Sequence, residues 1–405
     1  MSIKIKCYPA SNGESFLIKL QGENTTNILI DSGYKSTAKH IIKDLEDIKN
    51  SNENLDLVIL THIDNDHING ARDILEYIIN NNINVGEIWY NDYLKIVDMI
   101  ESNDFPKNLN KEEIQFSEKL DQLSSIEYPE ENNYAKKESV GVYTATCLIE
   151  YLMYEKLFCK WNKSFNYKCA YKNENKPRVN INNDVSIYML GPNKTTLELL
   201  LKEWQDYIEK HINKYVNDKN IKIAKAFEKY MLVFKESVDA AEKCKCSNLD
   251  IDEMINYNTF DKDEINRSSI AIVIEFKDKK LLFLGDSSPI DIEQEIVNYT
   301  LENGKKFELF KVSHHGSRKN LSKKMIENIE CENYLISTNG NNHNHPDIES
   351  IMKILELSDE NKCIYLNYEP AHIISILKAL DKFNEDEIYS LNKNVFEDEI
   401  LIMEL

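Results

Sequence analysis

Short apolar runs alternate with polar segments along the first 90 residues, and their spacing predicts strands and helices in turn. Residues 2–20 alternate like two antiparallel strands joined by a turn at Asn12-Gly13. Further predicted elements are strands over 27–30, 57–60 and 85–90, and helices over 37–50 and 71–82. Strands interleaved with helices favour a layered α/β fold over an all-helical one.

The pattern changes in the middle of the chain. Residues 93–184 are polar and rich in aromatic residues, which we interpret as the core of an insertion. Residues 185–196 contain a strand that stops at Gly191-Pro192. Residues 197–261 predict a second insertion, in which a helical pattern from Thr195 to about 237 carries mixed charge on a solvated face.

Strand patterning resumes in the last third of the chain. The predicted strands cover 268–276, 280–284, 307–312 and 334–338. We therefore expect one core fold, built from residues 1–92, 185–196 and 262–405, that the two insertions interrupt.

Metal-ligand side chains recur where four of these strands end. They are His62, Asp64, Asp66 and His67 after the first, Asp286 after the second, His314 and His315 after the third, and His343 and His345 after the fourth. Two imidazoles and two carboxylates within six residues repel or stay hydrated unless a cation gathers them, and a divalent metal does so best. The recurrence predicts a metal site at one edge of the sheets.

Composition limits the class of protein. The chain has 405 residues, 42% of them hydrophobic, which suits a large folded core. No signal peptide or membrane-spanning apolar run is recognisable, and the eight cysteines have no disulfide spacing, so we expect a cytoplasmic location, reduced thiols and no membrane contact. A net charge of −20 argues against broad capture of duplex nucleic acid, but not against cleavage of a phosphodiester held by metal ions.

The order of the motifs resembles the metallo-β-lactamase fold superfamily. The matching pieces are His62 to Gly70, Asn266 to Ser269, Gly285-Asp286, Lys311 to Ser317 and His345-Pro346. Within the superfamily they are most similar to the hydrolase domain of the DNA-uptake protein ComEC and its stand-alone relatives. The resemblance implies a four-layer αββα sandwich with two largely helical insertions and a metal site between the sheets.

By similarity, the site would hold two divalent ions, Mn²⁺ or Zn²⁺, with Mg²⁺ as a further candidate. His62 and Asp64 would contact the first ion, and Asp66 and His67 the second. Asp286 would bridge the two ions. His314, His315 or His345 would complete the second ion's ligands, and Asp31 would orient a metal-bound histidine from behind.

Two positions depart from the family pattern. Asp64 stands where the family has its second histidine, and the third motif has no histidine, since His211 falls in a charged helical stretch and reads as a surface residue. Asn91 or Asp92 is the best occupant of that third position. A first metal site so rich in oxygen ligands favours Mn²⁺ or Mg²⁺ over zinc. The alternative is that this first site holds no metal.

These residues imply hydrolysis by metal-activated water. Asp66 or Asp64 would take the proton, His315 or His345 would donate one, and Arg318 would contact phosphate. We expect a phosphodiesterase or nuclease acting on a small or single-stranded substrate. Two alternative functions stay open: a hydrolase of a lactone, thioester or β-lactam, and a non-catalytic metal-binding scaffold. The insertions could form a lid, an oligomer contact or a surface for a partner.

Overall fold

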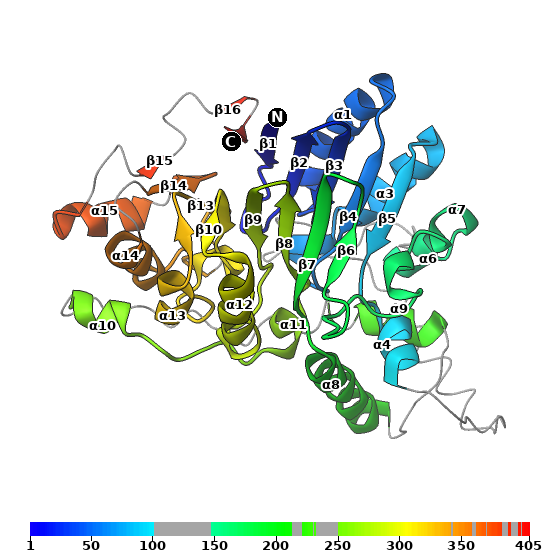
Figure 1. The fold of residues 1–405 in the computed structure, drawn as a ribbon. Helices are drawn as coiled ribbons and strands as arrows, with labels where there is room; N and C mark the ends of the chain where they lie inside the picture. Colours follow the sequence, from blue (N-terminus) through cyan, green and yellow to red (C-terminus); the bar gives the residue numbers. More distant parts are fainter. Residues whose placement is uncertain are drawn as a thin grey trace, which may run out of the picture.

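The computed structural model describes most of the chain. The described residues are 1–100, 147–212, 221–229, 231, 250–341, 343–358, 362–369, 371–382, 388–389, 396–397 and 399–405. Two multi-stranded sheets form its centre, and helices cover their outer faces (Figure 1).

The first sheet has the order β16-β17-β1-β2-β3-β4-β5. Its strands are β1 (Ser2–Cys7), β2 (Phe16–Gln21), β3 (Thr25–Ile30), β4 (Leu55–Ile59), β5 (Val85–Trp89), β16 (Phe396–Glu397) and β17 (Ile400–Glu404). In β1 buried residues alternate with more exposed ones, as expected for a strand with one face on the core. Strand β17 pairs antiparallel with β1, so the end of the chain returns to the first sheet.

The second sheet has the order β15-β14-β13-β11-β9-β8-β7-β6. Its strands are β6 (Arg178–Asn180), β7 (Val185–Gly191), β8 (Ala271–Phe276), β9 (Lys279–Phe283), β11 (Leu309–Lys311), β13 (Asn333–Ile336), β14 (Cys363–Leu366) and β15 (Ile388–Tyr389). The single strand predicted over 307–312 is divided, because β10 (Lys306–Phe307) pairs separately with β12 (Glu330–Cys331). Strand β6 lies in the range predicted as an insertion, yet it extends this sheet.

The helices fill the connections between strands. They are α1 (Lys35–Asn50), α2 (Asn65–Ile68), α3 (Ala71–Asn81), α4 (Tyr93–Ile100), α6 (Leu148–Leu152), α7 (Glu155–Phe158), α8 (Lys194–Ile212), α9 (Ile221–Lys229), α10 (Ile251–Ile255), α11 (Glu264–Arg267), α12 (Pro289–Asn303), α13 (Lys323–Glu327), α14 (Ile348–Leu357) and α15 (Ala371–Ala379), with 3₁₀ turns η1 (Lys163–Phe165) and η3 (His314–Gly316). The described parts of the helical stretch predicted up to residue 237 are α8, α9 and Met231, and the rest lies outside the described residues. No described helix combines the length and apolar character that crossing a bilayer requires.

Three apolar cores hold the layers together. One lies between the sheets and includes Phe16 and Ile18 from the first sheet and Ile272 and Leu281 from the second. The other two pack helices onto the outer face of each sheet, with α1 and α3 on one side and α12 to α14 on the other. These cores confirm the predicted α/β sandwich of helix, sheet, sheet and helix layers.

Candidate metal centre

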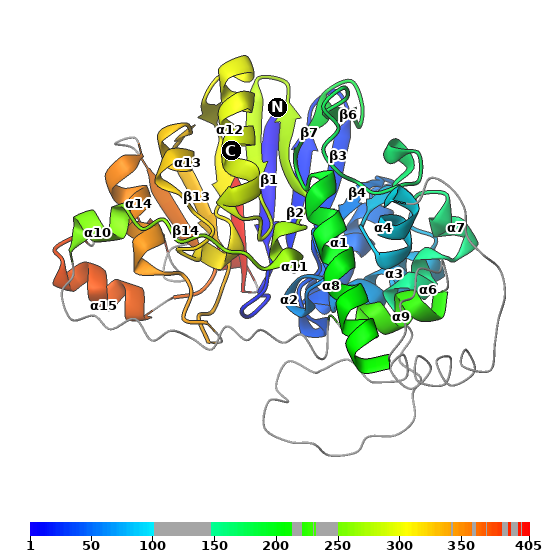
Figure 2. The same ribbon diagram turned by 90° about the horizontal axis from the view of Figure 1, so that it is seen from below.

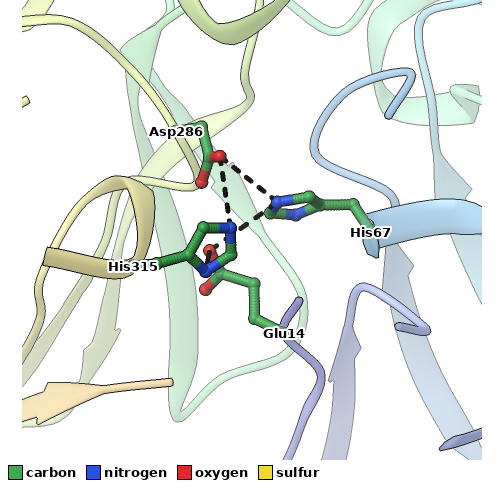
Figure 3. A group of neighbouring side chains, drawn as sticks. All are labelled: Glu14, His67, Asp286 and His315. Carbon is green, nitrogen blue, oxygen red and sulfur yellow. Dashed lines mark ion pairs between the residues drawn. The ribbon is translucent and has the colours of Figure 1, made fainter. Parts of the chain in front are cut away.

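Four buried side chains from distant parts of the chain converge at one edge of the sandwich. Glu14 comes from the β1–β2 turn, His67 from α2 after β4, Asp286 from the loop after β9, and His315 from η3 after β11. Their ligand atoms all lie within 4.8 Å of one another. Figure 3 shows the four side chains pointing toward a common centre, and Figure 2 looks onto this edge, with α2 between the two sheets.

Asp286 lies at the middle of the histidines. Its Oδ2 is 3.3 Å from Nε2 of His67 and 3.6 Å from Nε2 of both His314 and His315. Burial alone would raise the pKa of Asp286, but His314, His67 and His315 outweigh burial and hold it well below its usual range. The carboxylate is therefore ionised and faces several ligand nitrogens at once.

Asp66 borders the same group from α2. Its Oδ2 is 3.2 Å from His315 Nε2, and its Oδ1 is 3.8 Å from His67 Nε2. Burial would raise the pKa of Asp66, but His67 and His315 together lower it below its usual range. Asp66 therefore adds a second ionised carboxylate beside the histidines.

The outer nitrogens of two histidines are already engaged. His67 Nδ1 is 2.9 Å from Asp31 Oδ2, and His315 Nδ1 is 3.0 Å from the carbonyl oxygen of Ser337. When Nδ1–H donates to such an acceptor, the Nε2 lone pair of a neutral imidazole points into the cluster, as in metal sites. Asp31 thus occupies the place expected from the sequence, and its effect on a metal ligand stays a prediction.

His62 lies against this cluster without belonging to the four. Its ring centroid is 4.2 Å from that of His67, and its Nδ1 is 3.1 Å from the hydroxyls of Thr61 and Ser269. Burial and the neighbouring His67 lower the pKa of His62 well below its usual value. A neutral His62 therefore keeps a buried Nε2 that can serve a cation.

The cluster has the features of a cation site. Glu14 Oε1, His62 Nε2, His67 Nε2 and Asp286 Oδ1 are buried and have no hydrogen-bond partner. Four carboxylates, those of Glu14, Asp31, Asp66 and Asp286, lie against the histidines of the cluster, and Glu14 also pairs with the ammonium group of Lys311. Buried negative charge and orphaned polar atoms are costly unless a cation compensates them. This mixed nitrogen and oxygen donor set fits a divalent metal such as Mn²⁺, Mg²⁺ or Zn²⁺.

Glu14 was not anticipated from the sequence. It pairs with the buried Lys311, and burial is the main reason that its pKa is raised to about 8. A Cβ on Gly13 would lie 2.1 Å from the carbonyl oxygen of Asp66, so only glycine lets the turn approach α2 this closely. The available signal was this glycine next to an acid in a hairpin turn, which does not reveal the partner segment.

Three predicted ligands lie outside the four-residue group and make other hydrogen bonds. Asp64 caps α2 by accepting the Asn65 N–H at 2.6 Å, and burial together with Asp66 raises its pKa to about 7. Both amide atoms of Asn91 bond the backbone of Ala170. Asp92 accepts the Lys95 N–H at 3.0 Å, at the start of α4. The end of β5 thus serves the packing of the following segment, and none of the three lies in the four-residue group.

His314 borders the cluster on the side of the second sheet. Its Nδ1 is 3.0 Å from Asn320 Oδ1 and 3.4 Å from Asp261 Oδ2, which turns Nε2 toward Asp286. Burial would lower the pKa of His314, but Asp286 and Asp261 raise it to about 10. A protonated His314 is therefore available at the rim of the cluster. Asp261 and Asn320 were not among the predicted site residues.

Two other predicted residues lie further out. His345 has its ring centroid 5.4 Å from that of His314, and its Nδ1 is 3.5 Å from Asp347 Oδ2. Arg318, predicted to contact phosphate, instead donates to Glu349 at 2.9 Å and lies over the ring of Tyr257. His345 thus flanks His314 rather than the four-residue group.

Comparison with known proteins bears on the first part of the chain. No curated protein matches the sequence. A family match covers residues 9–130, a range that includes Glu14, Asp66 and His67. Residues 9–130 match the family model of the metallo-beta-lactamase superfamily, and the two-sheet α/β sandwich is consistent with that fold.

Proposed function

We propose that this protein is a metal-dependent phosphodiesterase that acts on a nucleic acid or a nucleotide. The family match and the buried ligand cluster both support a metal-dependent hydrolase. The observation that carries the proposal is the ionised Asp286, whose Oδ2 lies within 3.6 Å of three imidazole Nε2 atoms. The closer likeness to ComEC stays a prediction.

The residues that would hold the metal are His67, His315, Asp286, Glu14 and Asp66, with His62 beside them. When bound, a divalent metal supplies Lewis-acid stabilisation of developing negative charge and lowers the pKa of water to about 7. Three of these ligands are carboxylates, and hard oxygen donors suit Mn²⁺ or Mg²⁺, the ions that commonly assist phosphate chemistry. This composition favours a phosphodiester over the acyl bonds that we also considered.

His314 is the best candidate to act on the substrate directly. Its Nδ1 lies 3.4 Å from Asp261 Oδ2, and this carboxylate, which is not among the proposed metal ligands, favours the protonated imidazole. Asn320 and Asp261 fix its Nδ1, so its Nε2–H can bind a phosphate oxygen or give a proton to the leaving group. In this proposal His315 is a metal ligand, and His314 takes the donor role first expected of His315 or His345.

Metal analysis of the purified protein, combined with hydrolysis of bis-p-nitrophenyl phosphate in Mn²⁺, Mg²⁺ and Zn²⁺, tests the proposal. We expect bound metal and turnover that falls by at least about 100-fold in Asp286→Asn and His67→Ala, because both remove a central ligand. Asp278→Asn, at an exposed turn between β8 and β9, is the matched control and should keep full activity. The proposal would be contradicted if the purified wild-type protein held no metal and its activity did not exceed that of the two variants.

A further inference from the structure

We propose that the exposed side chains of residues 153–168 form a docking surface for single-stranded nucleic acid. We call this the basic–aromatic surface, and it consists of Tyr154, Lys156, Phe158, Lys163, Tyr167 and Lys168. The inference rests on the proposed function, since it names the substrate class that the metal centre would cut.

The first argument is local charge. The whole chain carries a net charge of −20, with 69 acidic residues. Residues 153–168, by contrast, contain four lysines and one acidic residue, Glu155. Within the described part of the chain, Lys163 and Lys168 are exposed and have no carboxylate partner. A basic segment on an acidic protein gives a polyanion one favourable place to bind.

The second argument is aromatic exposure. Tyr154, Phe158 and Tyr167 are 45%, 46% and 46% exposed, whereas most large aromatic residues in this fold are buried. The aromatic residues of segment 93–184, which we predicted to form the core of an insertion, therefore differ in burial. Trp161 is buried, whereas these three are exposed. Exposed rings beside lysines are the elements that bind single strands, because bases stack on the rings and phosphates contact the ammonium groups.

The surface is held in place by the first sheet. Trp161 forms a parallel bridge with Ile88, and its Nε1–H donates to the Tyr90 carbonyl oxygen at 2.9 Å. This connection extends the first sheet beyond β5, and α7 lies at that outer edge (Figure 1). A rigid support of this kind lowers the entropy cost of ordering side chains on binding.

Lys95 joins the aromatic residues into one surface. Its Nζ lies 4.0 Å from the centroid of the Trp161 ring and 5.8 Å from that of Phe158, and it donates to the Tyr167 carbonyl oxygen at 2.6 Å. The ring of Phe158 and the backbone carbonyl of Tyr167 therefore lie at the same ammonium group. Tyr154 adjoins Phe158 through one turn of α7, since its carbonyl oxygen accepts the Phe158 N–H.

A single strand fits this surface better than a duplex does. Only unpaired bases can present their faces to Phe158 and Tyr167. A long duplex would also bring more phosphates close to an otherwise acidic molecule. A protein partner is the alternative occupant of the surface, and its binding would not require a nucleic-acid backbone.

Fluorescence anisotropy with a labelled 20-nucleotide oligo-dT tests the proposal. The full chain is titrated in EDTA, so that binding is measured without cleavage. We expect the double variant Lys163→Glu/Lys168→Glu to bind at least about tenfold more weakly, with a salt dependence shallower by about 1.4 log units per log unit of salt, since each phosphate contact contributes about 0.7. Phe158→Ala/Tyr167→Ala should lose at least about fivefold through lost stacking.

The matched control is Lys39→Glu/Lys43→Glu, the same charge change at two exposed lysines of α1, which should alter binding less than about twofold. Equal weakening in this control would mean that net charge rather than the surface governs binding, and would overturn the proposal. So would a wild-type chain that does not bind oligo-dT, a result that would leave a protein partner for the surface.

Hydrolysis of bis-p-nitrophenyl phosphate separates this proposal from the proposed function. The small substrate does not need the surface, so the lysine variant should hydrolyse it at the wild-type rate. Turnover of this substrate by a wild-type chain that fails to bind oligo-dT would reject the surface alone. Tight oligo-dT binding without any metal-dependent turnover would reject the hydrolase and keep the surface.

Discussion

The Asp31 side chain contacts two residues that follow β4, Thr61 and His67. Its carboxylate accepts the Thr61 N–H at 2.7 Å and the Thr61 hydroxyl at 2.8 Å, and it lies 2.9 Å from His67 Nδ1. Its backbone has a φ of 56°, a conformation that Asp and Asn tolerate better than most residues. An Asn at this position therefore keeps the backbone while changing the acceptor for His67.

We predict that Asp31→Asn weakens Mn²⁺ binding about 10- to 100-fold, because His67 loses the carboxylate that fixes its tautomer. Isothermal titration calorimetry measures this change. Asp56→Asn is the control, since Asp56 also accepts a backbone N–H, that of Asn27 at 2.8 Å, but in the strand β4 rather than at the cluster. Equal affinities of Asp31→Asn and wild type would remove Asp31 from the metal site.

The sequence predicts which residue types lie near the strand ends, but not the directions in which their side chains point. His67, Asp286 and His315 follow apolar runs, so the sequence indicates that they meet at one sheet edge. Glu14 has no such signal, because its position depends on a turn that contacts helix α2 at Asp66. Asn91 was expected at the site, but its amide makes two backbone bonds to Ala170, and local sequence does not encode that partner.

At the scale of elements, most strands and helices follow from periodicity, and the exceptions have physical causes. The strand predicted over 307–312 satisfies the apolar pattern, yet it divides because β10 pairs with β12 while β11 pairs with β9. Strand β6 is too short to stand out in a polar segment and is defined by its pairing with β7. Pairing partners of this kind are tertiary information.

Helix α14 contains a buried lysine that makes the stability of the fold depend on pH. Lys353 donates to the carbonyl oxygens of Tyr257 at 3.0 Å and Leu321 at 2.7 Å. Burial lowers its pKa to about 8 from an ordinary value of 10.5. Between these two values the unfolded chain binds one more proton than the folded chain, so the contribution of Lys353 to the free energy of unfolding rises with pH.

We predict that the free energy of unfolding of the wild type rises by about 1.5 kcal/mol, relative to that of Lys353→Met, between pH 8 and pH 9.5. Urea unfolding at the two pH values measures the difference. Methionine has a similar length but does not titrate, so the variant reports what all the other groups contribute. Parallel pH profiles for the two proteins would show that the Lys353 ammonium is not destabilised by burial.

At the scale of the whole molecule, the sandwich serves to bring four distant segments to one edge. Glu14 and His67 lie in connections between strands of the first sheet, and Asp286 and His315 follow strands of the second. The core between the sheets, which includes Ile18 and Leu281, fixes their separation. Metal binding at this edge would therefore hold the two sheets together, and it should stabilise the fold as a whole.

We predict that Mn²⁺ at about 100 times its dissociation constant raises the free energy of unfolding by about 2.7 kcal/mol over protein in EDTA, or the melting temperature by about 3 °C. Differential scanning calorimetry measures the shift. An acidic chain of net charge −20 also attracts Mn²⁺ weakly over its surface, and this would stabilise any variant equally. Asp286→Asn should therefore lose most of the shift, while the exposed control Asp278→Asn keeps it, since both remove one carboxylate charge. An equal shift in both variants would place the stabilising ions on the surface and not between the sheets.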